Sequence, residues 1–296
     1  MDHISVCICT YKRPELLQRL FAELSRQETA NLFSYSIVVA DNDREESARA
    51  TVEAFARGGA IEVTYCMEPT PNIALARNKV ISHARGDFLA FIDDDEFPVK
   101  DWLLVLYRTV KSHNVAGALA PVLPHFDVQP PKWLTKAGFY DRPRHETGFV
   151  MKFQECRTGN VLLRRSILDA NPDVFRAEFG TGGEDVDFFR RMIEKGHKFI
   201  WCDEAPVYEV VPPHRCDRSF LLKRALLRGE ISSRQPRGRL KNLLKSTIAV
   251  PAYSLALPFL YIFGDHLFMK YLIRMFDHLG RLLAVCHLNP MRERCN

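Results

Sequence analysis

The sequence Phe88-Leu-Ala-Phe-Ile-Asp-Asp-Asp-Glu96 places an unbroken apolar run directly before three consecutive aspartates. A short run of this kind is typical of a strand that is buried on both faces, as in a parallel sheet covered by helices. The strand must end where the charges begin, because unpaired carboxylates are unstable in a dry core. We therefore expect Asp93, Asp94 and Asp95 at the carboxyl end of a central strand, which is the edge where open α/β sheets bind ligands.

Three adjacent carboxylates repel one another unless a cation neutralises them. Their hard oxygen atoms are the ligands that Mg²⁺ prefers in proteins. The alternative is a solvated acidic turn without a ligand. The apolar strand directly before the aspartates favours a divalent-metal site over that alternative.

The rest of the chain alternates between strand and helix patterns, which indicates an α/β fold with a mostly parallel central sheet and helices on both faces. The β-type runs predict strands at residues 4–10, 35–40, 61–67, 88–92, 115–121 and 158–163. Helical spacing of apolar residues predicts helices at 16–24, about 45–57, 73–84, 102–110 and from 184 onward.

Two other predicted strands also end in polar residues, Thr10 and Asp41. An acid after the second strand is suited to hydrogen bonds with a nucleoside. The chain has neither the Gly-x-Gly-x-x-Gly turn after its first strand nor a Gly-x-x-x-x-Gly-Lys-Ser/Thr motif, which argues against NAD binding and a P-loop. A nucleotide at this edge would need a metal to neutralise its phosphates.

Two later segments have more than one interpretation. The stretch 125–145 is predicted to be a long irregular loop, and its aromatic residues either stack on sugar rings or pack against the sheet. Gly180-Thr-Gly-Gly183 precedes Glu184 and Asp185 at a predicted helix start. Acids there either complement the helix dipole or, with a glycine-rich approach, supply a catalytic carboxylate.

Length and composition are ordinary for a globular protein of 296 residues, and the net charge is +5. Basic residues are concentrated between Arg215 and Lys245, which indicates an anionic partner. No aromatic-interleaved binding motif accompanies these charges, so nucleic acid is not the expected partner. With no signal peptide at the N-terminus, the eight cysteines are expected to be reduced in the cytosol.

The composition changes after Gly229, so we predict a first domain at 1–229 and a basic, apolar, helical region at 230–296. Residues 247–264 carry no charge, but Pro251 and Pro258 argue against a membrane-spanning helix. Residues 267–288 could form an amphipathic helix in the membrane interface. The alternative is a helix packed on the first domain or on another copy of the chain in a homo-oligomer. The upstream basic run favours the membrane surface.

With these residues in hand, the chain resembles the family 2 glycosyltransferases of the GT-A fold. It is most similar to bacterial exopolysaccharide enzymes of the succinoglycan glucosyltransferase type. The resemblance covers about residues 5–229. It rests on the following motifs in this order: Cys9-Thr-Tyr-Lys-Arg-Pro14, Val39-Ala-Asp-Asn42, Asn72-Ile-Ala-Leu-Ala-Arg-Asn78, Ala84-Arg-Gly-Asp87, Phe91-Ile-Asp-Asp-Asp95 and Gly183-Glu-Asp185.

The resemblance implies a role for each matching position. Asp185 would be the catalytic base, and Asp95 would ligate Mg²⁺ or Mn²⁺ on the diphosphate. The nucleotide-sugar-binding positions would be Thr10, Tyr11, Arg13, Asp41, Arg77, Asp93, Asp94 and Glu184. The implied reaction is an inverting transfer of a sugar, glucose in the closest group, from a UDP-sugar to a polyprenyl-diphosphate-linked glycan. It would take place at the cytoplasmic face of the bacterial inner membrane.

The chain departs from the family pattern in two places. It lacks the Gln-x-x-Arg-Trp motif of processive relatives, because Arg234-Gln-Pro-Arg-Gly-Arg239 contains no Trp, so we expect a single transfer. His214 stands where some GT-A enzymes place a late metal or phosphate ligand, although a lone histidine is more often structural or exposed.

Two other functions fit parts of the sequence. A GT-A-like sugar-phosphate nucleotidyltransferase would use the same aspartates, but it would normally carry a glycine-rich basic loop where this chain has Tyr11-Lys-Arg-Pro14. A non-catalytic membrane scaffold would use the C-terminal segments and would need no acids at the strand ends.

Overall fold

The computed structural model describes residues 1–59, 61–168, 173–180, 182–233 and 239–285. The chain divides into two compact units. The first unit contains Met1–Leu123 and Arg142–Glu209, and the second contains Pro124–Asp141 and Val210–Asn296. The motif Arg234-Gln-Pro-Arg-Gly-Arg239, except its last residue, and Cys286 and Cys295 lie outside the described residues.

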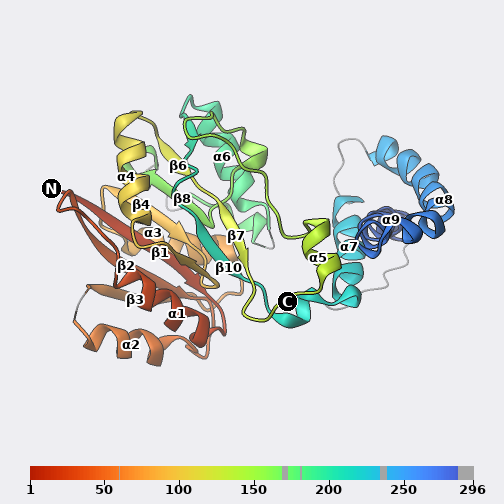
Figure 1. The fold of residues 1–296 in the computed structure, drawn as a ribbon. Coiled ribbons are helices and arrows are strands. Elements are labelled where there is room, and N and C mark those ends of the chain that lie inside the picture. The colour runs from red at the N-terminus through yellow and green to blue at the C-terminus, as the bar shows by residue number, and fades with distance from the viewer. Residues whose placement is uncertain (60, 169–172, 181, 234–238, 286–296) are drawn as a thin grey trace. The chain divides into compact units, whose positions relative to one another are not determined.

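A seven-stranded sheet with the order β3-β2-β1-β4-β8-β6-β9 forms the centre of the first unit (Figure 1). Its strands are β1 (Asp2–Thr10), β2 (Phe33–Asp41), β3 (Val63–Met67), β4 (Phe88–Ile92), β6 (Gly117–Leu119), β8 (Asn160–Arg164) and β9 (Phe199–Trp201). Strand β8 runs antiparallel to β4 and β6, and the other neighbours are parallel. The predicted α/β fold with a mostly parallel sheet is therefore confirmed.

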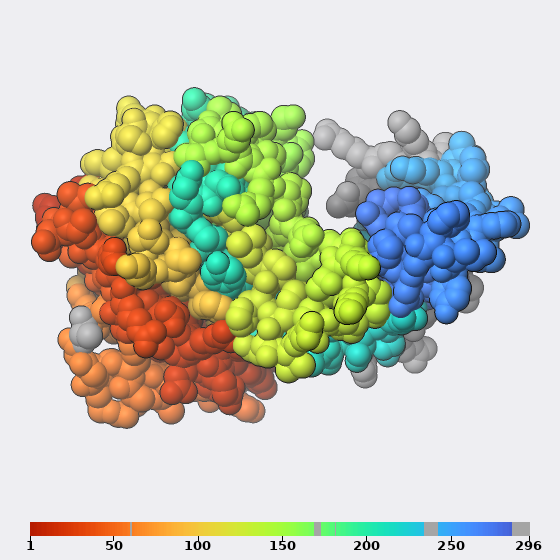
Figure 2. Space-filling view, in the orientation of Figure 1, coloured from red at the N-terminus to blue at the C-terminus, as the bar shows by residue number. Residues whose placement is uncertain are grey.

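Helices cover both faces of this sheet. Helices α1 (Pro14–Leu24), α2 (Arg49–Arg57) and α4 (Trp102–Ser112) pack into one apolar cluster with alternate residues of β1 and β4. Helices α3 (Ile73–His83) and α6 (Glu184–Glu194) pack into a second cluster with the intervening residues. All five residues of β4 are buried, as the apolar run before the aspartates predicted. Figure 2 shows the N-terminal half of this unit, coloured red to yellow, packed directly against its green and teal parts.

Some predicted boundaries were wrong. Helix α2 begins at Arg49 rather than near residue 45, because Glu46 has a φ of 54°, which a right-handed helix does not admit. Of the strand predicted at 115–121, only residues 117–119 form a strand, β6, and the next strand, β7 (Val122–His125), begins after the predicted range. Strands β7, β9, β5 (Glu96–Pro98) and β10 (Val207–Val210) were not predicted. Strands β5, β10 and β7 form a smaller sheet in the order β5-β10-β7.

The second unit is helical. It contains α5 (Lys132–Ala137), α7 (Arg218–Ser233), α8 (Arg239–Phe263) and α9 (Asp265–Val285). Helix α9 packs against α5, α7 and α8, and its Met269 and Ile273 are buried beside Leu134 and Leu221. The predicted long irregular loop is therefore partly helical. Its aromatic residues pack against this helical cluster rather than against the sheet, and they are partly buried there: Phe126, Trp133, Phe139 and Tyr140.

Helix α8 presents apolar side chains to the outside. It remains a helix through Pro251 and Pro258, the two prolines that argued against a membrane-spanning helix at this position. Its segment Asn242–Phe263, with a mean hydropathy of 1.5, is long and apolar enough to cross a membrane. Exposed large apolar residues along it are Leu244, Ile248, Leu255, Phe259, Tyr261, Ile262 and Phe263.

The predicted domain boundary after Gly229 falls inside α7 (Arg218–Ser233). The compact units instead separate at positions 123, 141 and 209, because residues 124–141 pack with the C-terminal helices. A functional division of the chain at 229 stays a prediction.

Candidate active site

The carboxyl ends of β1, β2 and β4 meet at one edge of the large sheet. Thr10 pairs with Asp41 in the parallel register of β1 and β2, and the Asn42 N–H donates to the Thr10 carbonyl at 2.8 Å. The Thr10 hydroxyl donates to Oδ2 of Asp94 at 2.8 Å. The structure thus brings together three predicted site residues, Thr10, Asp41 and Asp94, as the parallel topology requires.

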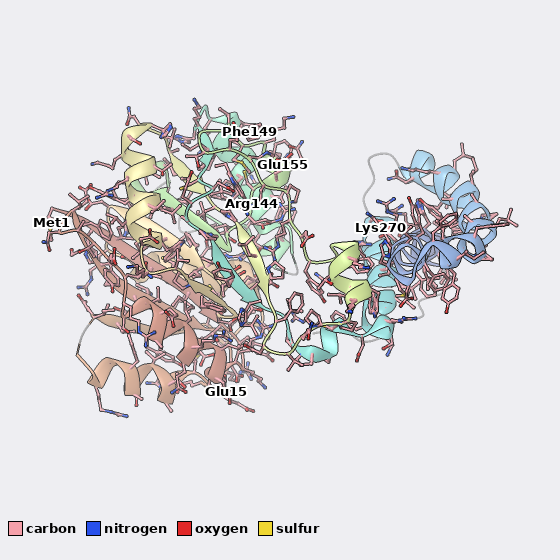
Figure 3. The ribbon with its side chains drawn as sticks, viewed as in Figure 1. Met1, Glu15, Arg144, Phe149, Glu155 and Lys270 are labelled. Atoms are coloured by element: carbon pink, nitrogen blue, oxygen red, sulfur yellow. The ribbon has the colours of Figure 1, made fainter. Side chains whose placement is uncertain are left out.

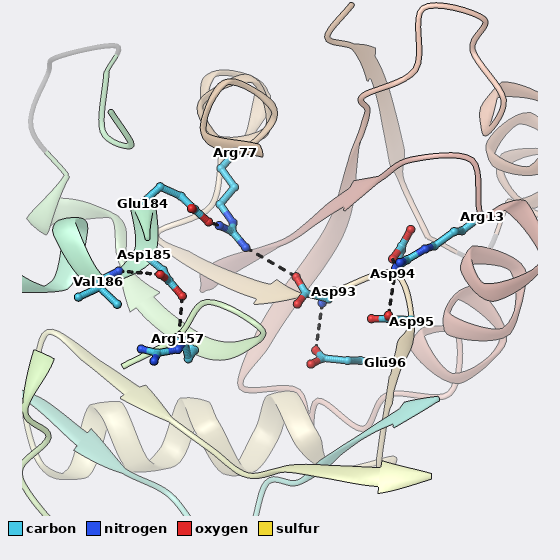
Figure 4. Close-up of polar contacts among 10 residues, drawn as sticks. All are labelled: Arg13, Arg77, Asp93, Asp94, Asp95, Glu96, Arg157, Glu184, Asp185 and Val186. Carbon is cyan, nitrogen blue, oxygen red and sulfur yellow. Dashed lines mark hydrogen bonds and ion pairs between the residues drawn. The ribbon is translucent and has the colours of Figure 1, made fainter. Parts of the chain in front are cut away.

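Arg13 joins the segment after β1 to the acids after β4 (Figure 4). Its Nη1 lies 3.0 Å from Oδ1 of Asp94 and 3.0 Å from Oδ2 of Asp95. Pro14 begins α1 directly after it, so the start of that helix fixes where the Arg13 backbone lies. Tyr11, another predicted site residue, precedes it in the same segment and is 45% exposed.

The environment of Asp94 and Asp95 is unfavourable for negative charge. Burial, together with the neighbouring Asp93 and Asp94, raises the pKa of Asp95 to about 7, although Arg13 opposes the shift. Burial also raises the pKa of Asp94, which Arg13 and Thr10 partly offset. Asp95 would therefore be stabilised by additional positive charge in its surroundings.

Asp93 faces the outside of this corner, and its side chain is 47% exposed. Its backbone N–H donates to Oε2 of Glu96 at 3.0 Å, and the Glu96 N–H donates to the Asp93 carbonyl at 3.1 Å. Glu96 is buried, and burial raises its pKa well above the ordinary value. The two bonds between Asp93 and Glu96 therefore stabilise the turn that contains the three aspartates. No role was predicted for Glu96, because an acid after three others has no distinguishing pattern.

Arg77 connects this corner to the start of α6 (Figure 4). The guanidinium is buried, forms an ion pair with Glu184, and places Nη2 at 3.8 Å from Oδ1 of Asp93. The guanidinium carbon, Cζ, also lies 5.7 Å from the ring centroid of Phe175, which is a cation–π contact. Two segments that are distant in sequence are thus linked by one cation.

The glycine-rich segment allows α6 to begin at this point. Gly182 and Gly183 have φ values of 126° and 97°, a region that other residues rarely adopt. The Gly180 carbonyl accepts from the Ile73 N–H, which anchors the segment beside the start of α3. These contacts explain why glycines precede Glu184 and Asp185.

Glu184 and Asp185 differ in environment. Burial raises the pKa of Glu184 against the influence of Arg77, and its Oε2 has no hydrogen-bond partner among the described residues. In Asp185, Oδ1 accepts from the Val186 N–H at 2.7 Å, and Oδ2 lies 3.9 Å from Nε of Arg157. The Asp185 side chain is 15% exposed. Arg157 was not identified from the sequence, where no motif singles it out.

Asp41 is fully buried and already bonded within the protein. Its Oδ1 accepts from the Asp43 N–H at 3.1 Å, and its Oδ2 accepts from the Ala48 N–H at 2.8 Å and from the Tyr65 hydroxyl at 3.1 Å. These bonds shape the loop after β2. The proposed contact with a nucleoside stays a prediction. Asp43, two residues on, has a buried Oδ2 without a partner in the described part of the chain, and no role was predicted for it.

The carboxylates at the end of β4 could supply some, but not all, of the ligands of a divalent cation. Asp95 offers hard oxygen atoms in a place where added positive charge would be favourable. However, no group of three or more potential ligand side chains is assembled within the described ranges. This is the arrangement expected of Mg²⁺-type sites in which one or two carboxylates bind and the substrate phosphates and water complete the coordination.

His214 lies in the second unit, in the 3-10 helix Pro213–Cys216. Its ring packs edge-on against Phe220 with a centroid distance of 5.8 Å. This contact gives His214 a packing role within its own unit. Its role as a metal ligand stays a prediction.

The fold also occurs in solved glycosyltransferases. S. aureus TarS 1–349 in complex with UDP is 17% identical, with a TM-score of 0.57 and coverage of 97% of this chain and 91% of that chain. The mannosyltransferase PcManGT from Pyrobaculum calidifontis, in complex with GDP-Man and Mn²⁺, has a TM-score of 0.62 at 15% identity and covers 97% of this chain and 87% of that chain. At these identities the likeness establishes the GT-A fold alone.

Sequence comparisons establish the family. The chain is 38% identical over 238 residues to the succinoglycan biosynthesis protein ExoM of Rhizobium meliloti, covering 78% of this chain and 74% of ExoM. It is 27% identical to the glucosyl-dolichyl phosphate glucuronosyltransferase of Haloferax volcanii, with 69% of this chain and 61% of that relative covered. Residues 5–170, more than half of the chain, match the family model described as glycosyl transferase family 2. The chain therefore belongs to glycosyl transferase family 2 and is a glycosyltransferase.

Proposed function

We propose that the chain is a metal-dependent, inverting glycosyltransferase that moves glucose from UDP-glucose to a hydroxyl group of a lipid-linked glycan. The process would be exopolysaccharide biosynthesis, in line with the name of its relative ExoM, which covers most of the chain. The observation that carries the proposal is the Arg77 bridge. It links Asp93, in the acidic corner, to Glu184, which directly precedes Asp185.

The acidic corner would hold the donor. Thr10, Arg13, Asp93 and Asp94 would line the nucleotide sugar, and Asp95 would hold Mg²⁺ or Mn²⁺. When bound there, the cation would neutralise charge that develops on the departing diphosphate. Arg13 already lies within 3.0 Å of two of these acids, so it can turn toward a diphosphate without leaving the corner.

Asp185 would be the general base. Its carboxylate would take the proton of the acceptor hydroxyl while that oxygen bonds to the anomeric carbon and the bond from that carbon to the diphosphate breaks. This single displacement inverts the anomeric configuration, so an α-linked donor gives a β-glycoside. The Val186 N–H and Arg157 hold the two carboxylate oxygens in place for this step.

The second unit would attach the enzyme to the cytoplasmic face of the membrane, where a polyprenyl-diphosphate acceptor is found. Because the buried face of α9 packs inside its own unit, the exposed apolar side chains of α8 are the better candidates for this contact. The alternative is that this exposed surface of α8 contacts another copy of the chain in a homo-oligomer.

The function can be tested with the purified full-length chain, Mn²⁺ and a panel of nucleotide sugars, by measuring nucleotide release with and without a lipid extract containing polyprenyl-linked glycans. We expect UDP release from UDP-glucose, increased by the extract. Release of pyrophosphate would instead indicate a nucleotidyltransferase. If the chain neither bound nor turned over any UDP-sugar, that result would contradict the proposal.

A further inference from the structure

The first unit contains a cavity of about 250 Å³ at the ends of β6, β8 and β9. Apolar residues, among them Leu119, Val122 and Met151, form much of its lining. Polar and aromatic side chains complete it: Arg142, His145, Gln154, Arg157, Asn160 and Trp201. None of these residues was assigned a role above except Arg157. All of them belong to the same compact unit as the acidic corner and Asp185.

One wall of the cavity adjoins the predicted catalytic groups. Arg157 lines the cavity, and its Nε lies 3.9 Å from Oδ2 of Asp185. Asn160 also lines it, and the preceding Gly159 lies so close to Asp93 that a Cβ there would be 3.2 Å from Oδ2. A ligand in this cavity would therefore lie near both the general base and the donor corner. An acceptor must occupy such a position to react.

The side chains of the cavity suit a sugar ring. The rings of His145 and Trp201 line the cavity and meet edge-on at a centroid distance of 5.6 Å, which gives an aromatic wall. Phe149, which does not line the cavity, stacks on His145 at a centroid distance of 4.1 Å. Such a wall can pack against the C–H face of a pyranose, while Gln154 and the arginines can bond to its hydroxyl groups. Figure 3 shows Phe149 and Glu155 in the same part of the unit.

The size of the cavity restricts what it can hold. Its volume of about 250 Å³ is below the roughly 300 Å³ at which pockets for drug-sized ligands begin. One sugar unit fits this volume, but a longer oligosaccharide does not. The remaining units of a glycan would extend from the opening.

The charges predict which kind of sugar binds. Each basic side chain of the cavity already faces a carboxylate: Arg142 pairs with Glu209, His145 Nε2 lies 2.8 Å from Glu155 Oε2, and Arg157 lies beside Asp185. An anionic sugar would find no uncompensated positive charge here and would have to displace one of these partners. A neutral sugar can bond to the same groups without breaking the pairs.

We propose that this cavity binds the terminal, uncharged pyranose unit of the acceptor, with Arg142, His145 and Trp201 as its recognition residues. This proposal rests on the proposed glycosyltransfer, because it uses Asp185 as the base. Arg142 and Arg144 provide a matched comparison. Their side chains are 47% and 49% exposed and each pairs with one carboxylate, but only Arg142 lines the cavity.

The test is saturation-transfer NMR on the full-length chain, with methyl β-D-glucopyranoside as the probe and methyl β-D-glucuronide as its anionic counterpart. We expect signal from the neutral glycoside and at least fivefold less from the glucuronide. Arg142→Ala and His145→Ala should each reduce the neutral signal at least fivefold, while Arg144→Ala should leave it unchanged. Thermal melting of each variant would verify that it is folded.

Equal signals in Arg142→Ala and Arg144→Ala, stronger binding of the glucuronide, or no signal from the wild-type chain would overturn the proposal. UDP release from UDP-glucose, measured on the same preparations, separates this result from the proposed function. UDP release without glycoside binding would reject the acceptor cavity alone. Glycoside binding without any donor turnover would also reject the assignment, because a sugar site beside an inactive centre is not an acceptor site.

Discussion

Nη1 of Arg13 lies 3.0 Å from Oδ2 of Asp95 and makes an equally short contact with Asp94. The guanidinium thus neutralises part of the negative charge at the end of β4. The contact also fixes the segment after β1 against the acidic corner, so the two segments that would enclose a nucleotide are held together before it binds.

Replacing Arg13 should weaken nucleotide binding. A hydrogen bond to a charged group contributes about 1.5–3 kcal/mol, so we expect Arg13→Ala to raise the dissociation constant of UDP about 10- to 100-fold in the presence of Mn²⁺. Isothermal titration calorimetry measures this directly. The control is Arg26→Ala, since Arg26 is an exposed residue of the first unit whose side chain pairs with Glu23. Equal UDP affinities in the two variants would remove Arg13 from the site.

Asp185→Asn should separate donor binding from transfer. The amide keeps the shape of the side chain and can still accept from the Val186 N–H, but it cannot take a proton. We expect UDP binding within about threefold of wild type and a loss of transfer of about 10²- to 10⁴-fold. Glu178→Gln, at a side chain that is 67% exposed, serves as the control for removing an acid nearby. If Asp185→Asn lost binding and transfer together, the residue would be structural.

Asp187 is expected to contribute to the stability of the folded chain and not to catalysis. Its side chain is 3% exposed and accepts from Arg190 at 2.9 Å and from Arg191 at 2.8 Å. Because these arginines are partly exposed, we expect Asp187→Asn to lower the free energy of unfolding by about 1–2 kcal/mol. Urea denaturation would measure the change, and wild-type stability in the variant would contradict this role.

The lowered pKa of Asp187 also predicts that the free energy of unfolding depends on pH. Burial alone would raise the pKa of Asp187, but the hydrogen bonds from Arg190 and Arg191 outweigh it and lower the pKa. The folded state therefore favours the ionised carboxylate, and its contribution is present above the unfolded pKa of about 3.9 and lost as the pH falls. The stability difference between wild type and Asp187→Asn should shrink when urea denaturation is repeated from pH 6 down to about pH 3. A constant difference would contradict the assignment.

The exposed face of α8 should control membrane attachment. The double variant Phe259→Asp/Ile262→Asp changes side chains that are 67% and 79% exposed, so folding should be little affected. We expect it to lose most binding to vesicles containing anionic lipid in a co-sedimentation assay. Val128→Asp, at another exposed apolar residue of the same unit, is the control. Unchanged sedimentation of the α8 variant, or an equal loss in the control, would favour contact with another copy of the chain.

The sequence predicted the centre of the fold well, because the relevant signals there are local. The five apolar residues of β4 and the acids that follow them are adjacent in the chain, and the parallel topology then places Thr10, Asp41 and Asp94 together. The glycine approach to α6 was predictable for the same reason, since Gly182 and Gly183 adopt backbone angles that favour glycine.

Other features depend on contacts between distant segments and could not be read in the same way. Arg157 is near Asp185 only because its turn packs against α6, and the cavity beside it combines residues from 119 to 201. Residues 125–145 were expected to be irregular because their prolines obscure the short helix α5. The C-terminal amphipathic pattern was correctly identified as a helix, but the sequence did not indicate that the buried face of α9 packs within its own unit.

The central claim is that Asp95 holds a cation that in turn holds the nucleotide diphosphate. The most direct measurement is a calorimetric titration of UDP into the wild-type chain and into Asp95→Asn, each with Mn²⁺ and with EDTA. We predict that wild-type binding requires Mn²⁺ and that Asp95→Asn binds UDP equally weakly under both conditions. Binding of UDP to the wild-type chain with the same affinity in Mn²⁺ and in EDTA would contradict the account.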